Sequence, residues 1–83
     1  MARDERTLDA VLNGRGTIPF RDLEHLLLAL GFTHARTRGS HHIYAHPRVT
    51  RSLNIQPIGK DAKRYQIGQL RDIIIEFGLR LES

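Results

Sequence analysis

Three histidines, His41, His42 and His46, fall within six residues of each other. They lie in a strand-like segment that also carries apolar and aromatic residues, and Arg36 and Arg38 precede them. An imidazole titrates near neutral pH and arginine attracts anions, so the segment could present a titratable group to a polyanion. An ordinary hairpin whose histidines have no chemical role is the alternative.

His41 is of the residue type that an RNA-cleaving site requires. RNA carries its own nucleophile, the 2′-hydroxyl group, so a nuclease must only deprotonate it, protonate the leaving oxygen and stabilise charge on the phosphoryl group. An imidazole can perform either proton transfer, each worth about 10²- to 10⁴-fold in rate. Arg36 and Arg38 could stabilise the phosphoryl charge, and Ser40 could bind phosphate or orient the ring.

The two-residue period of a strand separates the histidines into two sets. His42 and His46 share one face with Tyr44, and His41 lies on the other; the pattern does not decide which face points to the helices. We expect His42 to pack or to orient a ring rather than to act as a second base. Strand residues four apart are about 13 Å apart, too far for one shared metal ion. We therefore expect neither a metal site nor a cofactor.

The chain is short and basic. Its 83 residues allow one domain with a small core, because chains of this size bury only about 60% of their unfolded surface. Thirteen Lys and Arg against nine Asp and Glu give a net charge of +4, with the excess in residues 33–64, which favours nucleic acid or an acidic protein as partner. The longest apolar run is too short for a membrane span, and the amino terminus lacks the apolar segment of a signal peptide. We expect a cytoplasmic protein without membrane contact.

The elements that position these residues follow from apolar periodicity. Apolar residues at helical spacing predict helices over residues 4–13, 21–30 and 65–77. Alternation predicts strands over residues 32–38, 40–46 and 52–56, with a tight turn at residues 38 and 39 and a basic loop over residues 59–63. Gly68 weakens the last helix and would permit it to begin there.

This order predicts one α+β domain over residues 1–83. Residues 1–17 would be an N-terminal helical extension and connector, and residues 18–80 would form the core. There, a three-stranded antiparallel sheet would have both longer helices on one face and its other face open to solvent or ligand. The core order, α-β-β-β-α, is also that of the double-stranded RNA-binding domain.

Two motifs accompany these elements. Residues 39–44 read Gly-Ser-His-His-Ile-Tyr, after a helix that ends in Leu-Gly-Phe, and residues 68–79 read Gly-Gln-Leu-Arg-Asp-Ile-Ile-Ile-Glu-Phe-Gly-Leu. With them, residues 20–79 resemble the HicA toxins of bacterial toxin and antitoxin pairs. The resemblance implies a fold like the double-stranded RNA-binding domain, a metal-independent endoribonuclease that acts on messenger RNA, and inhibition by a HicB antitoxin encoded beside it. In that family the histidine after the Gly-Ser or Gly-Gly pair is catalytic, which here is His41.

The basic loops supply further candidates for RNA contact. Their cations could follow a phosphate backbone and the tyrosines between them could stack a base: Arg48, Arg51, Lys60, Lys63, Arg64, Tyr44 and Tyr65. Of these, we expect Lys60 and Lys63 to join Arg36, Arg38 and Ser40 as RNA-binding residues. The commoner HicA pattern has a Pro, His and Lys stretch after the third strand. Its replacement here, together with the extra N-terminal helix, indicates a divergent branch.

Three functions from different classes fit these observations. The first is a HicA-like toxin that cleaves messenger RNA with His41 and is held by a HicB-like antitoxin. The second is a non-catalytic RNA-binding module, which needs the same basic surface but not the imidazole. The third is an interaction protein whose basic face docks an acidic partner. Cleavage of RNA distinguishes the first function from the other two.

Overall fold

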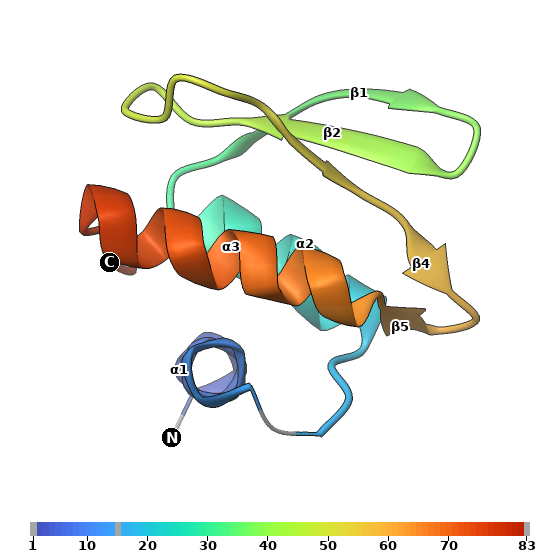
Figure 1. The fold of residues 1–83 in the computed structure, drawn as a ribbon, viewed down its shortest axis with the longest axis horizontal. Helices are drawn as coiled ribbons and strands as arrows, with labels where there is room; N and C mark the ends of the chain where they lie inside the picture. The colour runs from blue at the N-terminus through green and yellow to red at the C-terminus, as the bar shows by residue number, and fades with distance from the viewer. Residues whose placement is uncertain (1, 15, 83) are drawn as a thin grey trace.

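Two helices cover one face of a three-stranded antiparallel sheet in the computed structural model, which describes residues 2–14 and 16–82. The sheet has the order β1-β2-β3, formed by β1 (Thr33–Arg38), β2 (His41–Ala45) and β3 (Leu53–Ile55). The helices are α2 (Phe20–Ala29) and α3 (Arg64–Phe77), both below the sheet in Figure 1. The predicted α+β fold is confirmed. None of the described helices is long and apolar enough to cross a membrane.

The core lies between the sheet and the helix pair. Apolar side chains repeat at helical spacing along α2 and α3 and at alternate positions of β3, so one face of each of these three elements is buried. Burial of a Leu or Ile side chain contributes about 1.5–3 kcal/mol. The most deeply buried of these side chains are Leu23, Leu26, Leu27, Leu30, Tyr44, Ile55, Leu70 and Ile73.

A two-residue turn joins β1 and β2. Arg38 pairs with His41, so the central residues of the turn are Gly39 and Ser40, one position later than predicted. Gly39 has φ 60° and Ser40 has no positive φ, which is the pattern of a type II′ turn, whose first central position favours glycine. His41 therefore begins β2 directly after the turn.

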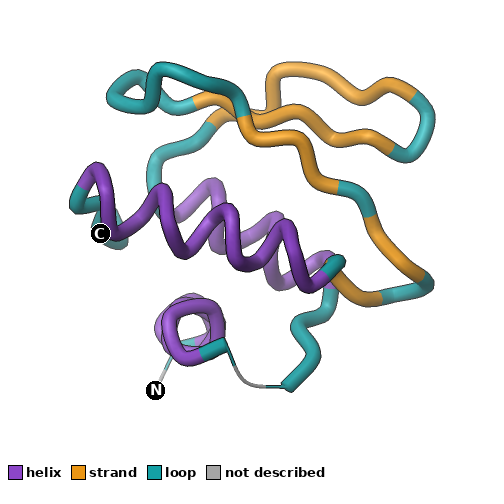
Figure 2. The backbone as a smooth tube through the Cα atoms, viewed as in Figure 1, coloured by secondary structure: helices purple, strands orange, loops and turns teal. Residues whose placement is uncertain are grey.

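The segment after β3 is a short hairpin rather than the predicted loop. Its strands, β4 (Pro57–Ile58) and β5 (Asp61–Ala62), pair antiparallel around a turn that contains Lys60. The backbone N–H of Phe20 donates to the Lys60 carbonyl over 2.8 Å, which ties the hairpin to the start of α2. Both this hairpin and the β1–β2 turn lie toward the right-hand end of the molecule in Figure 2.

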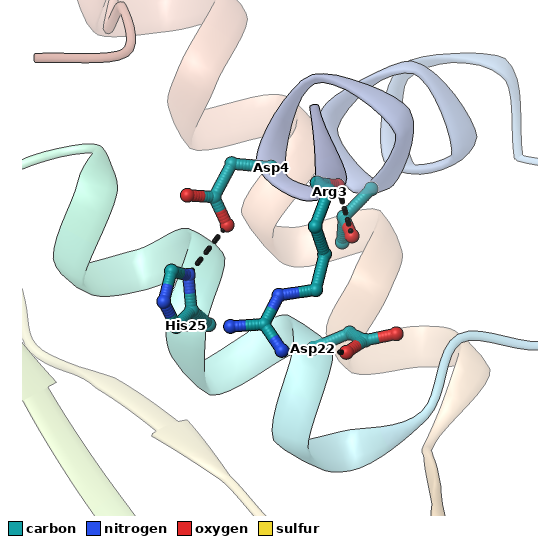
Figure 3. A network of polar contacts seen from close by, with 5 residues as sticks. Arg3, Asp4, Asp22 and His25 are labelled. Carbon is teal, nitrogen blue, oxygen red and sulfur yellow. Dashed lines mark hydrogen bonds and ion pairs between the residues drawn. The ribbon is translucent and has the colours of Figure 1, made fainter. Parts of the chain in front are cut away.

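The N-terminal helix α1 (Arg3–Asn13) packs on the side of the helix pair that faces away from the sheet (Figure 1). Val11 is completely buried in the common core. A hydrogen bond and an ion pair join α1 to α2: Asp4 Oδ1 lies 2.7 Å from His25 Nδ1, and Arg3 Nη1 lies 3.9 Å from Asp22 Oδ1 (Figure 3). Because exposed ion pairs add little stability, apolar burial holds α1 in place.

Gly68 lies inside α3, which begins at Arg64, so a helix start at Gly68 is wrong. A Cβ atom there would meet no described atom within 4 Å, and the φ angle is not positive. We predict that Gly68→Ala raises the free energy of unfolding by about 0.5–1 kcal/mol, because alanine loses less backbone entropy on folding. Denaturant unfolding followed by circular dichroism measures the difference.

The matched control for this substitution is Gly78→Ala at the end of the same helix. Gly78 has φ 61°, which is strained for a residue with a Cβ atom, so this variant should lose stability. A Gly68→Ala variant no more stable than the wild type would contradict the prediction.

Candidate active site

His41 is exposed at the start of β2 and its ring contacts Asn54 on β3. Nδ1 of His41 lies 3.2 Å from Oδ1 of Asn54. An amide oxygen only accepts hydrogen bonds, so Nδ1 carries a hydrogen and donates it. Nε2 is then the nitrogen that can take or release a proton. Asn54 alternates with Leu53 and Ile55, which is typical of the polar face of a strand, but nothing in the sequence indicated its contact with His41.

Arg36 and Arg38 lie on the same face of the sheet as His41. Arg38 pairs with His41 across the strands and Arg36 pairs with Ile43, and directly opposite residues share a face. This placement depends on a β-bulge between His34 and Arg36, which shifts the register by one residue. Both arginines are exposed, and neither side chain has a hydrogen-bond or ion-pair partner among the described residues. Their charges are available to an anion.

The other three predicted RNA-binding residues lie in turns and at a helix start. Ser40 is exposed in the β1–β2 turn beside His41. Lys60 is exposed in the β4–β5 turn, and Lys63 is the N-cap residue of α3. The hairpin thus brings Arg36, Arg38 and Ser40 together with His41. Both lysines come from a different segment, which lies toward the same end of the molecule (Figure 1).

A groove of about 470 Å³ runs between β3 and α3, and His41 lines it. Polar side chains from both elements form its walls, while two buried apolar side chains also line it. The walls consist of Arg51, Ser52 and Asn54 beside β3 and of Tyr65, Gln69 and Asp72 on α3, and the apolar residues are Leu53 and Ile73. Arg51 and Tyr65 were among the predicted RNA contacts, whereas Gln69 and Asp72 were not predicted to lie near His41. Their helical spacing from Tyr65 was the available signal.

The opposite face of β2 points toward α2. Tyr44 is only 2% exposed, so the prediction that it stacks on a base is wrong. Its hydroxyl donates to Oε2 of Glu24 over 2.8 Å. Nδ1 of His42 lies 3.2 Å from the same oxygen, yet it has no hydrogen bond of acceptable direction with a described residue. His42 also packs edge-on against Phe20, with ring centroids 5.0 Å apart, so it packs as expected.

Glu24, His34 and His42 bring three ligand-type atoms within 4.8 Å of one another. The two imidazole rings stack, with centroids 5.5 Å apart and planes at 28°. Lone pairs in the planes of stacked rings do not converge on one point, as tetrahedral coordination requires. His34 Nε2 is also hydrogen-bonded to Thr37 Oγ1 over 2.8 Å. As they stand, these residues form a packing network under the hairpin.

His46 is buried after the end of β2. Its Nε2 lies 3.0 Å from the Leu30 carbonyl oxygen, and its Nδ1 accepts the Arg48 backbone N–H over 3.0 Å. Because a carbonyl only accepts and a backbone N–H only donates, the ring is the neutral tautomer with hydrogen on Nε2. His46 ties the loop after β2 to the end of α2.

Burial raises the pKa of Tyr44, and the hydrogen bond to Glu24 and its negative charge raise that pKa further. The folded protein therefore keeps a proton that the unfolded chain loses above about pH 10, so stability falls as the pH rises beyond that value. We predict that Tyr44→Phe costs about 1–2 kcal/mol at pH 8, and that the wild type loses this advantage above about pH 10.

Urea unfolding at a series of pH values from 8 upward tests this prediction. Tyr65→Phe, which removes an exposed hydroxyl group, controls for the loss of one tyrosine. A stability difference between wild type and Tyr44→Phe that stays constant across the series would show that the Tyr44–Glu24 contact does not control the titration.

A family model described as HicA toxin of bacterial toxin-antitoxin matches residues 20–79. The match includes both helices of the pair, the whole sheet and every residue that lines the groove with His41, while α1 precedes it. No curated protein and no solved structure matches the chain.

Proposed function

The chain belongs to the HicA toxin family, and on this premise we propose that it is a cytoplasmic, metal-independent endoribonuclease that cleaves messenger RNA with His41 as its single catalytic histidine. Members of the family are ribonucleases of toxin–antitoxin pairs. One observation carries the assignment of His41: its exposed ring is oriented by Asn54, with Arg38 directly opposite on the neighbouring strand. A proton-transfer group and a phosphate-binding group thus face the same solvent.

His41 acts at Nε2, because Nδ1 is engaged with Asn54. The neutral ring takes the proton from a ribose 2′-hydroxyl, and the 2′-oxygen attacks the adjacent phosphorus as the bond to the 5′-oxygen breaks. The leaving oxygen takes a proton from water, so the products are a 2′,3′-cyclic phosphate and a 5′-hydroxyl. The imidazolium then releases its proton to solvent. The Nδ1–H bond to Asn54 persists in both charge states and holds the ring in place.

Arg38 and Arg36 stabilise the negative charge that grows on the phosphoryl oxygens during the attack. A guanidinium can offer two parallel N–H donors to a phosphate, which makes it well suited to this task. Ser40, in the turn between Arg38 and His41, donates its hydroxyl to the same phosphate. Lys60 and Lys63 bind phosphates farther along the strand, a contribution that weakens as salt rises.

The protein partner is a HicB-like antitoxin. Arg36, Arg38 and Lys60 are exposed cations and Lys63 is half-exposed, so an acidic antitoxin surface would be attracted to them. The same cations would therefore bind both RNA and the antitoxin. The proposal thus combines the RNA-cleaving toxin with a basic surface that docks an acidic partner. RNA cleavage by His41 distinguishes a toxin from a protein that only docks an acidic partner.

We predict that His41→Ala lowers RNA cleavage on the order of 10²-fold or more while RNA binding persists, because the cations remain in place. Purified protein is incubated with labelled single-stranded RNA in excess EDTA, and the fragments are resolved on a gel. His25→Ala is the control, since His25 is also exposed but lies on α2, where its ring contacts Asp4 of α1.

Two results of this assay would overturn the proposal. Wild-type cleavage by His41→Ala, with its fold confirmed by circular dichroism, would remove the histidine from catalysis. Cleavage by the wild type that EDTA abolishes would contradict independence from metal. RNA binding without any change in RNA length would instead support the non-catalytic RNA-binding module.

Asn54 is a positioning residue in this mechanism. We predict that Asn54→Ala lowers kcat by about 10-fold with little change in KM, because the ring loses the acceptor that fixes its orientation. Asn54→Asp retains an acceptor oxygen and should recover most of the rate. Steady-state cleavage of a short RNA measures both constants, and equal kcat values for Asn54→Ala and the wild type would contradict the role.

A further inference from the structure

The groove between β3 and α3 carries side chains that phosphate binding does not need. We propose that it binds one unpaired base of the RNA next to the scissile phosphate, and that it selects bases with an exocyclic amino group over uracil. The inference rests on the proposed function, because His41 places the groove beside the reaction. It adds the substrate feature that the site would recognise.

The groove residues of α3 form one stripe of the helix. Tyr65, Gln69 and Asp72 are related by steps of four and three, so they lie above one another on one face. All three are exposed, whereas Leu70 and Ile73 of the same helix are buried. The volume of about 470 Å³ lies within the range of about 300–1,000 Å³ found for ligand sites. Folding of the core therefore does not account for the stripe.

Tyr65 supplies a surface on which a base can stack. The residue is 61% exposed, so its ring is accessible from solvent. Gln66 Nε2 donates to its hydroxyl over 3.4 Å, which restrains the ring from one end. Unpaired RNA bases are commonly bound by stacking on aromatic side chains, an interaction that does not depend on the identity of the base.

Asp72 and Gln69 supply the selection between bases. A carboxylate only accepts hydrogen bonds, so Asp72 fits the amino group of adenine, cytosine or guanine. Uracil has two carbonyl oxygens and one N–H on its pairing edge. The Asp72 carboxylate would therefore face a carbonyl oxygen over most of that edge, and two acceptors repel each other. The Gln69 amide both donates and accepts, and its side chain has no hydrogen bond with another described residue. It can therefore complete the contact with any amino-bearing base.

Arg51 prevents the carboxylate from repelling the RNA strand. Its guanidinium lines the groove and lies 3.3 Å from Glu76 Oε1, which holds the side chain against α3. The groove thus offers a cation to the backbone phosphate and an acid to the base. If the groove instead accommodated a protein segment, binding of RNA would show no preference between bases. The experiment below distinguishes that case.

The test measures binding of 2′-O-methyl hexamers of adenine, cytosine or uracil by fluorescence anisotropy. These strands lack the nucleophilic hydroxyl, so binding is measured without cleavage. We expect the wild type to bind the adenine and cytosine strands about 10-fold more tightly than the uracil strand. Asp72→Asn should remove this preference, and Tyr65→Ala should weaken binding of the adenine and cytosine strands by about 10-fold.

Each variant has a matched control. Ile75→Ala removes another exposed apolar side chain from α3, and Asp9→Asn changes the net charge by the same amount as Asp72→Asn but lies on α1. The proposal is overturned if Tyr65→Ala binds like Ile75→Ala, or if Asp72→Asn keeps the base preference of the wild type. It is also overturned if the wild type shows no base preference.

The outcome is separate from that of the proposed function. Base selection that persists while His41→Ala cleaves RNA normally would refute only the catalytic role of His41. Cleavage that depends on His41, with no effect of Tyr65→Ala or Asp72→Asn on binding, would refute only the base site.

Discussion

The β1–β2 hairpin pairs Arg38 with His41 across a two-residue turn, and a bulge between His34 and Arg36 shifts the register by one residue. Without that bulge, strict alternation from His34 would place Arg36 and Arg38 on the face of Tyr44, under the sheet. With it, both arginines share the face of His41. One extra residue in an edge strand thus brings the cations and the imidazole to the same solvent-facing surface.

The other face of the hairpin is fixed by Glu24. Its Oε2 accepts the Tyr44 hydroxyl at 2.8 Å, which is a polar link between α2 and β2. Phe20 of α2 packs edge-on against His42 and adds an apolar link. Because Tyr44 and His42 are held inward, His41 between the turn and His42 must point outward. The orientation of the candidate catalytic ring is therefore a consequence of packing.

The elements of the fold were predictable because Leu23, Leu26 and Leu27 repeat at helical spacing and Leu53 and Ile55 alternate with polar neighbours. Asn54 and Glu24 were not, because each meets its partner across a large sequence separation that no local pattern encodes. A bulge leaves no signature in alternation alone, so the shared face of Arg38 and His41 was also hidden. The identity of the candidate catalytic residue came from the family resemblance, whereas its surroundings came from tertiary contacts.

Helix α3 borders three parts of the molecule, which are the core, the groove that contains His41 and a second groove toward α1. Leu70 and Ile73 point to the core, and Ile67 and Gly68 line a second groove toward α1. Tyr65, with Gln69 and Asp72 at the same helical face, lines the groove that contains His41. The two grooves share no lining residue, whereas Ile73 belongs both to the core and to the groove that contains His41. The N-terminal helix α1 therefore packs against α3 without lining the groove that contains His41.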